Sequence, residues 1–184
     1  TVDPDDFKQL LLKGNSIYRQ SKIDQIYTSK ETASRLNKTK TEQNPFAIVL
    51  SCADSRVPPE LLFDLSIGDL FVVRVAGNIV SSAAFASIDF AVNALGVKNI
   101  IILGHKGCGA VENASKESNP EFSSTLNSLL YAISWNIGEK TGMEAIEQNV
   151  LVTKDMLYTP QFWQQLEKQD WRKGREEQAE QTYA

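Results

Sequence analysis

Three apolar runs in the first 110 residues indicate buried β-strands. They are FAIVLSC (46–52), DLFVVRVAG (69–77) and KNIIILGH (98–105). Each run is continuously apolar instead of alternating with polar residues, which is typical of strands that are covered on both faces. The pattern therefore predicts a central, mainly parallel β-sheet with a covering layer on each side.

A helical pattern lies between the second and third runs, in SSAAFASIDFAVNALG (81–96). Ser81 or Ser82 can cap its start and Gly96 can end it. The apolar stripe at helical spacing consists of Phe85, Ile88, Val92 and Leu95. A strand, a helix and a strand of this length predict a right-handed crossover. Because apolar residues also occur off the stripe, we expect a partner subunit to bury a second side of this helix, at Ala86, Phe90 and Ala94.

Further helical patterns bracket this region. The first, DPDDFKQLLLKGNSIY (3–18), has Asp3 as a candidate cap and Pro4 at the first helical position. Its residues expected to face the protein body are Phe7, Leu10, Leu11 and Ile17. Two more helices are predicted within 120–138 and 143–158, and a short one over TPQFWQQLEKQ (159–169). The predicted fold class is α/β, a mainly parallel sheet flanked by helices, with an N-terminal helical arm.

Chemically active side chains follow the first apolar run. The stretch SCADSR (51–56) places Cys52, Asp54 and Arg56 on alternate residues. If the backbone stays extended beyond Ser51, these three side chains project to one side. The stretch also stands at the carboxyl end of a predicted strand, where open α/β sheets bind their ligands.

A second reactive stretch, GHKGCG (104–109), follows the third run. Its His105 and Cys108 are three residues apart, where a glycine-bracketed loop can start a helix and both side chains can reach one point. With Cys52 they supply two thiols and one imidazole, a ligand set that suits zinc, and Asp54 can provide a fourth ligand. These residues include both cysteines and the single histidine of the chain.

Each of these residues also has an ordinary interpretation. A cysteine after an apolar strand is often a small core residue. Asp54 and Arg56 can form a surface ion pair of little energetic consequence. The two cysteines can form a disulfide if their backbones approach closely enough. The coincidence of four metal-competent groups at two strand ends favours the metal site over these alternatives.

The same residues resemble the signature of the β-class carbonic anhydrases, C-x-D-x-R followed later in the chain by H-x-x-C. The resemblance extends from about Gln43 to Val111. It implies Zn²⁺ bound by Cys52, His105 and Cys108, with Asp54 and Arg56 as a catalytic pair beside it. In a closed state of such sites, the aspartate becomes the fourth zinc ligand.

Single positions resemble pocket residues of the family. Gln43 matches a glutamine that reaches into the neighbouring subunit's pocket, Phe71 and Ala76 match apolar lining residues, and the Gly109 amide matches a donor to a substrate oxygen. Phe90 stands where plant members usually have tyrosine, so an apolar lining role is expected there. The resemblance implies a homodimer or higher homo-oligomer with the pocket at the subunit interface. The family usually has a further strand after its late helices, and no apolar run suggests one after Trp171.

The implied activity is the reversible hydration of carbon dioxide to bicarbonate and a proton, by attack of zinc-bound hydroxide on CO2. Hydrolysis of carbon disulfide or carbonyl sulfide by the same fold is one alternative. A non-catalytic binding module with structural zinc is another, and it needs four protein ligands. Because Arg56 competes for Asp54, we favour a site with an open fourth position.

Length and charge complete the expectations. The 184 residues suit a single domain over 1–184, divided into a helical arm (1–44), a metal-site core (45–111), a helical region (112–170) and a polar tail (171–184). A net charge of -4 without basic runs argues against a nucleic-acid partner. No apolar segment approaches the roughly 20 residues of a membrane span. Reduced thiols favour the cytoplasm, although a chain that begins at Thr1 is compatible with export and a removed leader.

Overall fold

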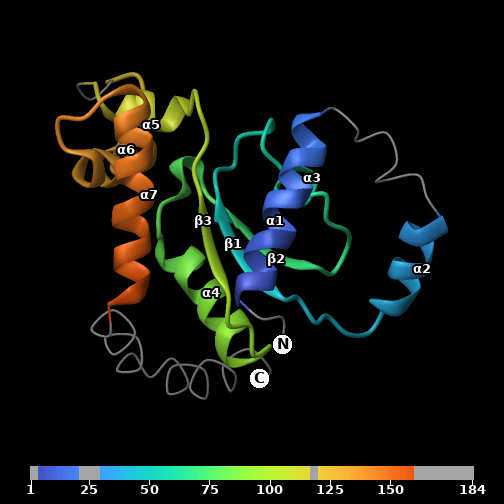
Figure 1. Ribbon diagram of the computed structural model, residues 1–184. Coiled ribbons are helices and arrows are strands. Elements are labelled where there is room, and N and C mark those ends of the chain that lie inside the picture. The colour runs from blue at the N-terminus through green and yellow to red at the C-terminus, as the bar shows by residue number, and fades with distance from the viewer. Residues whose placement is uncertain (1–3, 21–29, 117–119, 160–184) are drawn as a thin grey trace, which may run out of the picture.

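A parallel three-stranded sheet forms the centre of the part of the chain that the computed structural model describes, residues 4–20, 30–116 and 120–159 (Figure 1). Its strands are β1 (Ala47–Ser51), β2 (Leu70–Arg74) and β3 (Ile100–Leu103), in the order β2-β1-β3. Val49 of β1 stands opposite Val72 and Ile101. Every residue of β1 is buried, which explains its continuous apolar run and confirms the predicted parallel sheet.

Helix α4 (Ser82–Asn93) is the predicted crossover between β2 and β3. The Ser81 hydroxyl caps it by accepting a hydrogen bond from the Ala84 amide (3.2 Å). Beyond its end, Gly96 adopts a positive φ of 71°, as predicted for a helix stop. The core that α4 shares with the sheet includes Phe85, Ile88, Ile48, Leu50 and Val73. The second apolar side of the helix is open in the single chain, where Phe90 is 50% exposed.

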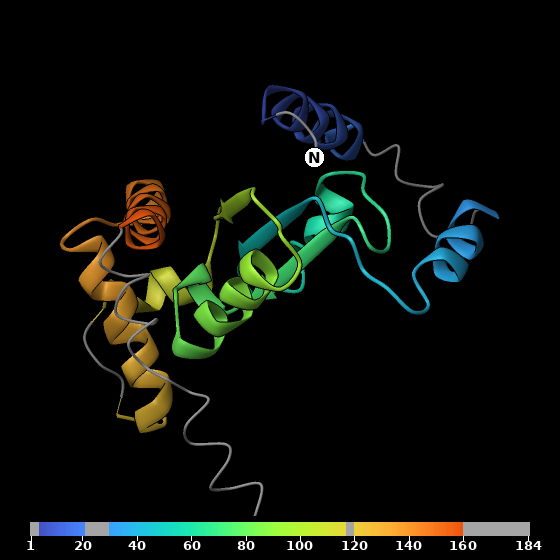
Figure 2. The ribbon, with the colours of Figure 1, turned by 90° about the horizontal axis from the view of Figure 1, so that it is seen from below.

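Helix α1 (Pro4–Arg19) lies across the sheet from α4 (Figure 2). Phe7 is buried and meets Phe46, which precedes β1, edge to face with ring centroids 5.7 Å apart. Gly14 lies against the chain at Phe63, where an added Cβ would be 1.7 Å from the carbonyl oxygen. The prediction for Leu10 is wrong, because that side chain is 40% exposed. The candidate cap Asp3 lies outside the described residues.

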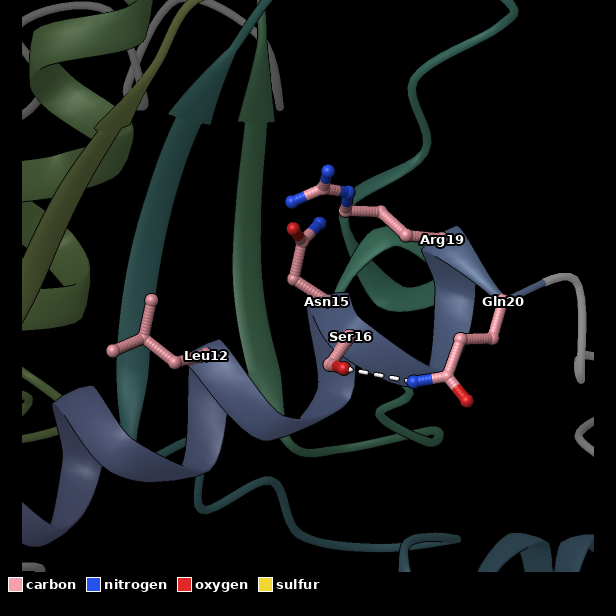
Figure 3. A pocket seen from close by; sticks show the side chains of 5 residues that line it. All are labelled: Leu12, Asn15, Ser16, Arg19 and Gln20. Atoms are coloured by element: carbon pink, nitrogen blue, oxygen red, sulfur yellow. Dashed lines mark hydrogen bonds between the residues drawn. The ribbon is translucent and has the colours of Figure 1, made fainter.

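The far end of α1 contacts the short helix α3 (Pro59–Leu62), where Asn15 Nδ2 donates to the Leu62 carbonyl (3.1 Å). A shallow hollow of about 370 Å³ opens here (Figure 3). It is lined by Leu12, Asn15, Ser16, Arg19 and Gln20. Helix α2 (Lys30–Lys38) lies farther out and is attached by an ion pair between Arg35 and Asp69.

The remaining helices gather beside β3 (Figure 1). They are α5 (Gly109–Ala114), α6 (Ser124–Ile137) and α7 (Gly142–Tyr158). Helix α6 begins at Ser124, inside the predicted range of 120–138. Ser123 sets this start, because its side chain accepts a hydrogen bond from the Leu126 amide (3.2 Å). Helix α7 comes so close to the end of β3 that a Cβ on Gly104 would lie 2.6 Å from Val150 Cγ2. Residues 160–169 of the predicted short helix and the tail 171–184 lie outside the described residues.

Within the described residues, no helix has both the length and the apolar character that crossing a bilayer requires.

Candidate metal centre

Two cysteines meet where β1 and the loop after β3 end. Cys52 directly follows β1 and is 3% exposed, and Cys108 is the residue immediately before α5 and is 1% exposed. Their sulfur atoms are 3.8 Å apart, and both thiols are free. Since a disulfide bond is about 2.05 Å long, the disulfide alternative does not describe this arrangement.

His105 completes the cluster. Its ring atom Nδ1 lies 3.1 Å from the Lys106 carbonyl oxygen, so the proton is assigned to Nδ1, which donates to that oxygen. The other nitrogen, Nε2, is buried and has no hydrogen-bond partner among the described residues. One ligand atom each from Cys52, His105 and Cys108 lies within 4.8 Å of the others. The structure thus brings together the three residues that the sequence singled out as metal ligands.

These three side chains fit a zinc ion. Two thiolates at about 2.3 Å from a tetrahedral zinc lie about 3.8 Å from each other, which is the separation of the two sulfur atoms here. A buried imidazole nitrogen without a partner is costly unless something accepts its lone pair. A metal ion bound between the three residues would remove that cost.

The two thiols share one proton in the metal-free chain. A hydrogen bond from Cys108 lowers the pKa of Cys52, against the opposing effect of burial, and the backbone amides of Asp54 and Gly77 lower it further. The same contact with Cys52 raises the pKa of Cys108, and burial adds to that rise. The contact between the two sulfur atoms therefore separates the two pKa values of the pair, with the pKa of Cys52 as the lower one.

We expect one thiolate per metal-free chain at neutral pH, measured by ultraviolet absorbance during a pH titration. Cys108→Ala should raise the pKa of Cys52 toward the ordinary thiol value of about 8.5, because its hydrogen-bond donor is lost. Cys52→Ala should lower the pKa of Cys108. Two thiols that ionise together near the ordinary value in the parent chain would contradict the shared proton.

Asp54 and Arg56 form a bidentate pair beside the cysteines. Arg56 Nε donates to Asp54 Oδ1 (2.9 Å) and Arg56 Nη2 donates to Oδ2 (2.7 Å). The Arg56 amide also donates to Oδ1 (2.9 Å), because the chain turns at Ser55 and Arg56. The condition of an extended backbone beyond Ser51 is therefore not met. The turn, and not strand alternation, brings the carboxylate and the guanidinium together.

This pair fixes the charge of Asp54 and its distance from the imidazole. Hydrogen bonds from the Arg56 guanidinium and amide hold the pKa of Asp54 well below its usual range. Asp54 Oδ2 lies 3.9 Å from His105 Nε2. Arg56 Nη2 also donates to the Gly107 carbonyl (2.9 Å), which connects the two site loops. A carboxylate held in this way is an ionised acceptor next to the three ligand atoms.

Two residues that the sequence analysis missed also hold the Cys52 loop. Arg74, at the end of β2, donates through Nε to the Cys52 carbonyl (2.9 Å) and through Nη2 to the Asp54 carbonyl. The Gly77 amide donates to the Cys52 sulfur (3.3 Å). The position of Arg74, at the end of a strand expected to neighbour β1, was a usable signal. The tertiary contact of Gly77 left no signal in the sequence pattern.

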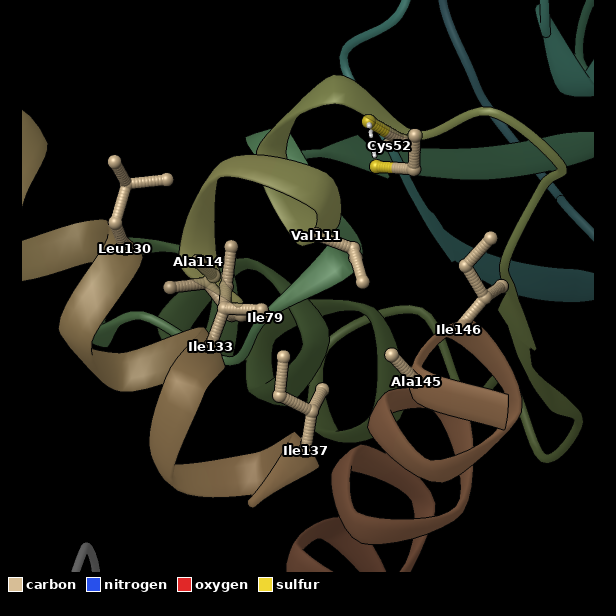
Figure 4. Close-up of a cluster of buried hydrophobic side chains, with 10 residues drawn as sticks. Cys52, Ile79, Val111, Ala114, Leu130, Ile133, Ile137, Ala145 and Ile146 are labelled. Atoms are coloured by element: carbon tan, nitrogen blue, oxygen red, sulfur yellow. Dashed lines mark hydrogen bonds between the residues drawn. The ribbon is translucent and has the colours of Figure 1, made fainter. Parts of the chain in front are cut away.

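An apolar cluster supports the cysteines from below the loops. Figure 4 shows Cys52 at its edge, with Val111 of α5, Ile133 of α6 and Ile146 of α7 around the centre. Cys108 belongs to the same cluster. Two of the three candidate metal ligands, Cys52 and Cys108, therefore pack against the hydrophobic core.

The residues that resemble family pocket positions are more dispersed in the single chain. Phe71 and Phe90 are neighbours, with ring centroids 6.3 Å apart, but Phe71 packs against the α4 core and not against the cysteine cluster. Ala76 is half-buried in the 3-10 turn Ala76–Asn78, close in sequence to Gly77. Gly109 is exposed, with open space where a Cβ would lie. Gln43 is exposed in the connection before β1.

Comparisons with known proteins agree with this geometry. The family model described as Carbonic anhydrase matches residues 47–172. Carbonic anhydrase 2 of Mycobacterium tuberculosis is 51% identical over 72 residues, which are 39% of this chain and 35% of that protein. The carbonic anhydrase of Pseudomonas aeruginosa is 47% identical over 77 residues, again 35% of its length. The chain thus matches about a third of the length of these curated relatives.

Solved structures give the same fold. The β-carbonic anhydrase CcaA superposes with a TM-score of 0.62 and 25% identity over 89% of this chain and 79% of its own. The β-carbonic anhydrase of Coccomyxa, solved with acetazolamide, gives a TM-score of 0.62 at 22% identity over 86% and 75% of the two chains. The family match covers more than half of the chain, and the three candidate ligand residues lie together. The chain therefore belongs to the carbonic anhydrase family and has the fold of the β class.

Proposed function

We propose that this chain binds zinc through Cys52, His105 and Cys108 and catalyses the reversible hydration of carbon dioxide to bicarbonate and a proton. One observation carries the proposal. Three ligand atoms that fit zinc lie within 4.8 Å of one another, and the neighbouring carboxylate is occupied by Arg56. Because that carboxylate already has a partner, a fourth metal position is left for a small ligand, as in catalytic zinc sites.

A bound zinc ion supplies Lewis acidity, which makes water a nucleophile near neutral pH. Asp54 accepts a hydrogen bond from the attacking water and so orients its lone pair toward the substrate carbon. Arg56 keeps Asp54 ionised and holds it on one side of the centre. In the closed state that the family resemblance implies, Asp54 would be the fourth ligand of the metal in place of its pairing with Arg56.

The proton that hydration releases is not carried away by a second histidine. His105 is the single histidine of the chain, and in this proposal its Nε2 is committed to the metal. Buffer molecules therefore carry the proton from the site, and activity should depend on buffer concentration.

The substrate pocket is completed by a second copy of the chain. Phe90 is 50% exposed and faces Phe71, so an apolar surface stands beside α4 without cover from its own chain in the described residues. Gln43 is exposed before β1. A homodimer that covers α4 places Gln43 of one chain at the pocket of the other, with Ala76 and Gly109 as lining and donor groups.

Zinc content and CO2 hydration, measured together, test the function. The zinc-loaded chain should accelerate hydration in a stopped-flow indicator assay. Asp54→Asn should keep its zinc and lose about 100-fold or more in rate, because a positioned acceptor of this kind contributes about 10²–10⁴-fold. Asp155→Asn is the matched control, since Asp155 is an exposed carboxylate on α7 that is paired with Lys154.

Three outcomes oppose the proposal. A chain that binds zinc but does not hydrate CO2 is a structural-zinc module. A chain that hydrolyses carbon disulfide or carbonyl sulfide without hydrating CO2 is the sibling hydrolase. Equal rates for Asp54→Asn and Asp155→Asn would remove Asp54 from the mechanism.

A further inference from the structure

A series of buried amide hydrogen bonds connects helices α6 and α7 to the sulfur of Cys52. Asn136 Nδ2 donates to Asn149 Oδ1 (2.9 Å), and Asn149 Nδ2 donates to the Gly77 carbonyl (2.7 Å). The Gly77 amide in turn donates to Cys52 Sγ (3.3 Å). Asn149 is fully buried, and Asn136 is 7% exposed. A buried polar group without partners is costly, so two amides in this position need a complete set of hydrogen bonds.

Gly77 is the point at which this series depends on backbone conformation. Its φ is 68° and its ψ is 20°, a left-handed conformation inside the turn Ala76–Asn78. An added Cβ would lie 2.5 Å from Ile133 Cδ1, so both the backbone conformation and the available space favour glycine here. A glycine has several accessible conformations, and its N–H direction is fixed only if the neighbouring peptide groups are held. Asn149 holds the carbonyl side of Gly77, and the hydrogen bond from the Asn78 amide to the Val75 carbonyl (2.8 Å) closes the turn.

We propose that Asn149, oriented by Asn136, is a positioning residue for the metal centre, because it holds Gly77 with its amide directed at the Cys52 sulfur. The inference rests on the proposed zinc binding and extends it to residues on α6 and α7. Within the part of the chain that the structure describes, the side-chain amides of both asparagines donate to groups other than the candidate ligands. Both act through the peptide groups of Gly77.

An amide that donates to a thiolate has two effects on metal binding. It withdraws electron density from the sulfur, which weakens its donation to the metal, and it fixes the sulfur before the metal arrives. Partners outside the ligand set typically change metal affinity about 10–100-fold when they are removed. From their positions on α6 and α7, the two asparagines thus influence both the electron density and the position of the Cys52 sulfur.

A purely structural role for the asparagines makes a different prediction. If they only join α6 to α7, their removal lowers the stability of the fold and leaves the bound metal unchanged. Cobalt(II) separates the two roles, because its thiolate charge-transfer absorption reports directly on the sulfur donors. This measurement is independent of CO2 hydration.

The test compares the cobalt-loaded parent chain with Asn149→Leu, a substitution that keeps the branching and the number of non-hydrogen atoms of the side chain and removes both hydrogen bonds. We expect the charge-transfer band to move to longer wavelength, because the sulfur becomes a stronger donor. We also expect cobalt affinity, measured by chelator competition, to fall about 10-fold or more. Asn136→Leu should change the band position and the cobalt affinity in the same directions as Asn149→Leu but by smaller amounts, since Asn149 can still donate to the Gly77 carbonyl.

Two control variants separate positioning from stability. Thr153→Val is nearly isosteric on the same helix, and it removes a buried hydroxyl that has no hydrogen-bond partner in the described part of the chain. Ile137→Val removes one methyl group from the same buried cluster, which lowers stability by about 0.5–1.5 kcal/mol. Neither should move the cobalt band.

The outcomes distinguish this inference from the proposed function. A parent chain that gives no thiolate-to-cobalt absorption overturns both. A parent with that absorption and an Asn149→Leu spectrum equal to that of Thr153→Val overturns the positioning role alone. A shift in Asn149→Leu that Ile137→Val does not reproduce supports it, including when Asn149→Leu is less stable. If Asn149→Leu does not fold, Asn136→Leu decides by the same comparison.

Discussion

Cys108→Ser is expected to remove zinc from the chain and to abolish carbon dioxide hydration. Serine has nearly the size of cysteine, but its hydroxyl does not ionise near neutral pH and is a poor zinc ligand. Zinc sites with four protein ligands bind with roughly 10–16 kcal/mol, so one ligand accounts for a few kcal/mol and its loss costs more than about 100-fold in affinity. Chelator competition and stopped-flow hydration should both report the loss.

The loss of zinc and activity in Cys108→Ser must result from the missing thiolate and not from unfolding of the chain. Circular dichroism of metal-free Cys108→Ser should match that of the metal-free parent chain. Ser115→Ala, at the exposed end of α5, serves as the control and should keep zinc and activity. If Cys108→Ser retained stoichiometric zinc at parental affinity, the assignment of Cys108 as a ligand would be wrong.

Ile133→Ala is expected to give the largest loss of stability among simple core substitutions. Ile133 is completely buried and belongs to the cluster that contains both cysteines. Its side chain fills the space next to the Gly77 Cα. Large-to-small changes of this kind cost about 2–5 kcal/mol, because the surrounding side chains only partly fill the cavity. Urea unfolding of the metal-free chain should show a lower midpoint with a similar slope.

Tyr131→Ala is the matched comparison on the same helix. Tyr131 is 68% exposed and contacts Trp135 with ring centroids 6.4 Å apart, so its removal should cost much less than that of Ile133. Equal midpoints for the two variants would show that the cluster below the cysteines does not determine the stability of this half of the molecule.

The ligand residues could be predicted because their positions follow from simple rules. The buried strand β1 is apolar at nearly every position, and a parallel sheet brings the carboxyl ends of its strands to one edge. Cys52 and His105 therefore had to lie near each other once β1 and β3 were recognised. The remaining ligand, Cys108, followed from its spacing to His105.

The details of the centre could not be predicted, because they depend on contacts between distant residues. Asn149 and Gly77 are 72 residues apart in sequence, and no periodicity relates them. The pairing of Asp54 with Arg56 was expected, but the turn at Ser55 that creates it was not. At the N-terminus, Leu10 fits the apolar stripe of α1, whereas the actual contact line passes through Phe7 and Gly14. Helical spacing alone does not say which part of a broad stripe meets the sheet.

The separation of the two cysteines along the chain has a consequence for folding. Cys52 and Cys108 are 56 residues apart, and the segment between them contains β2, α4 and β3. A metal ion that joins the two sulfurs acts as a reversible cross-link around two of the three strands. For a permanent link across a loop of this length, the lost freedom of the unfolded chain corresponds to about 4 kcal/mol. Metal loading would therefore raise the free energy of unfolding of this half of the protein, in addition to any role in a reaction.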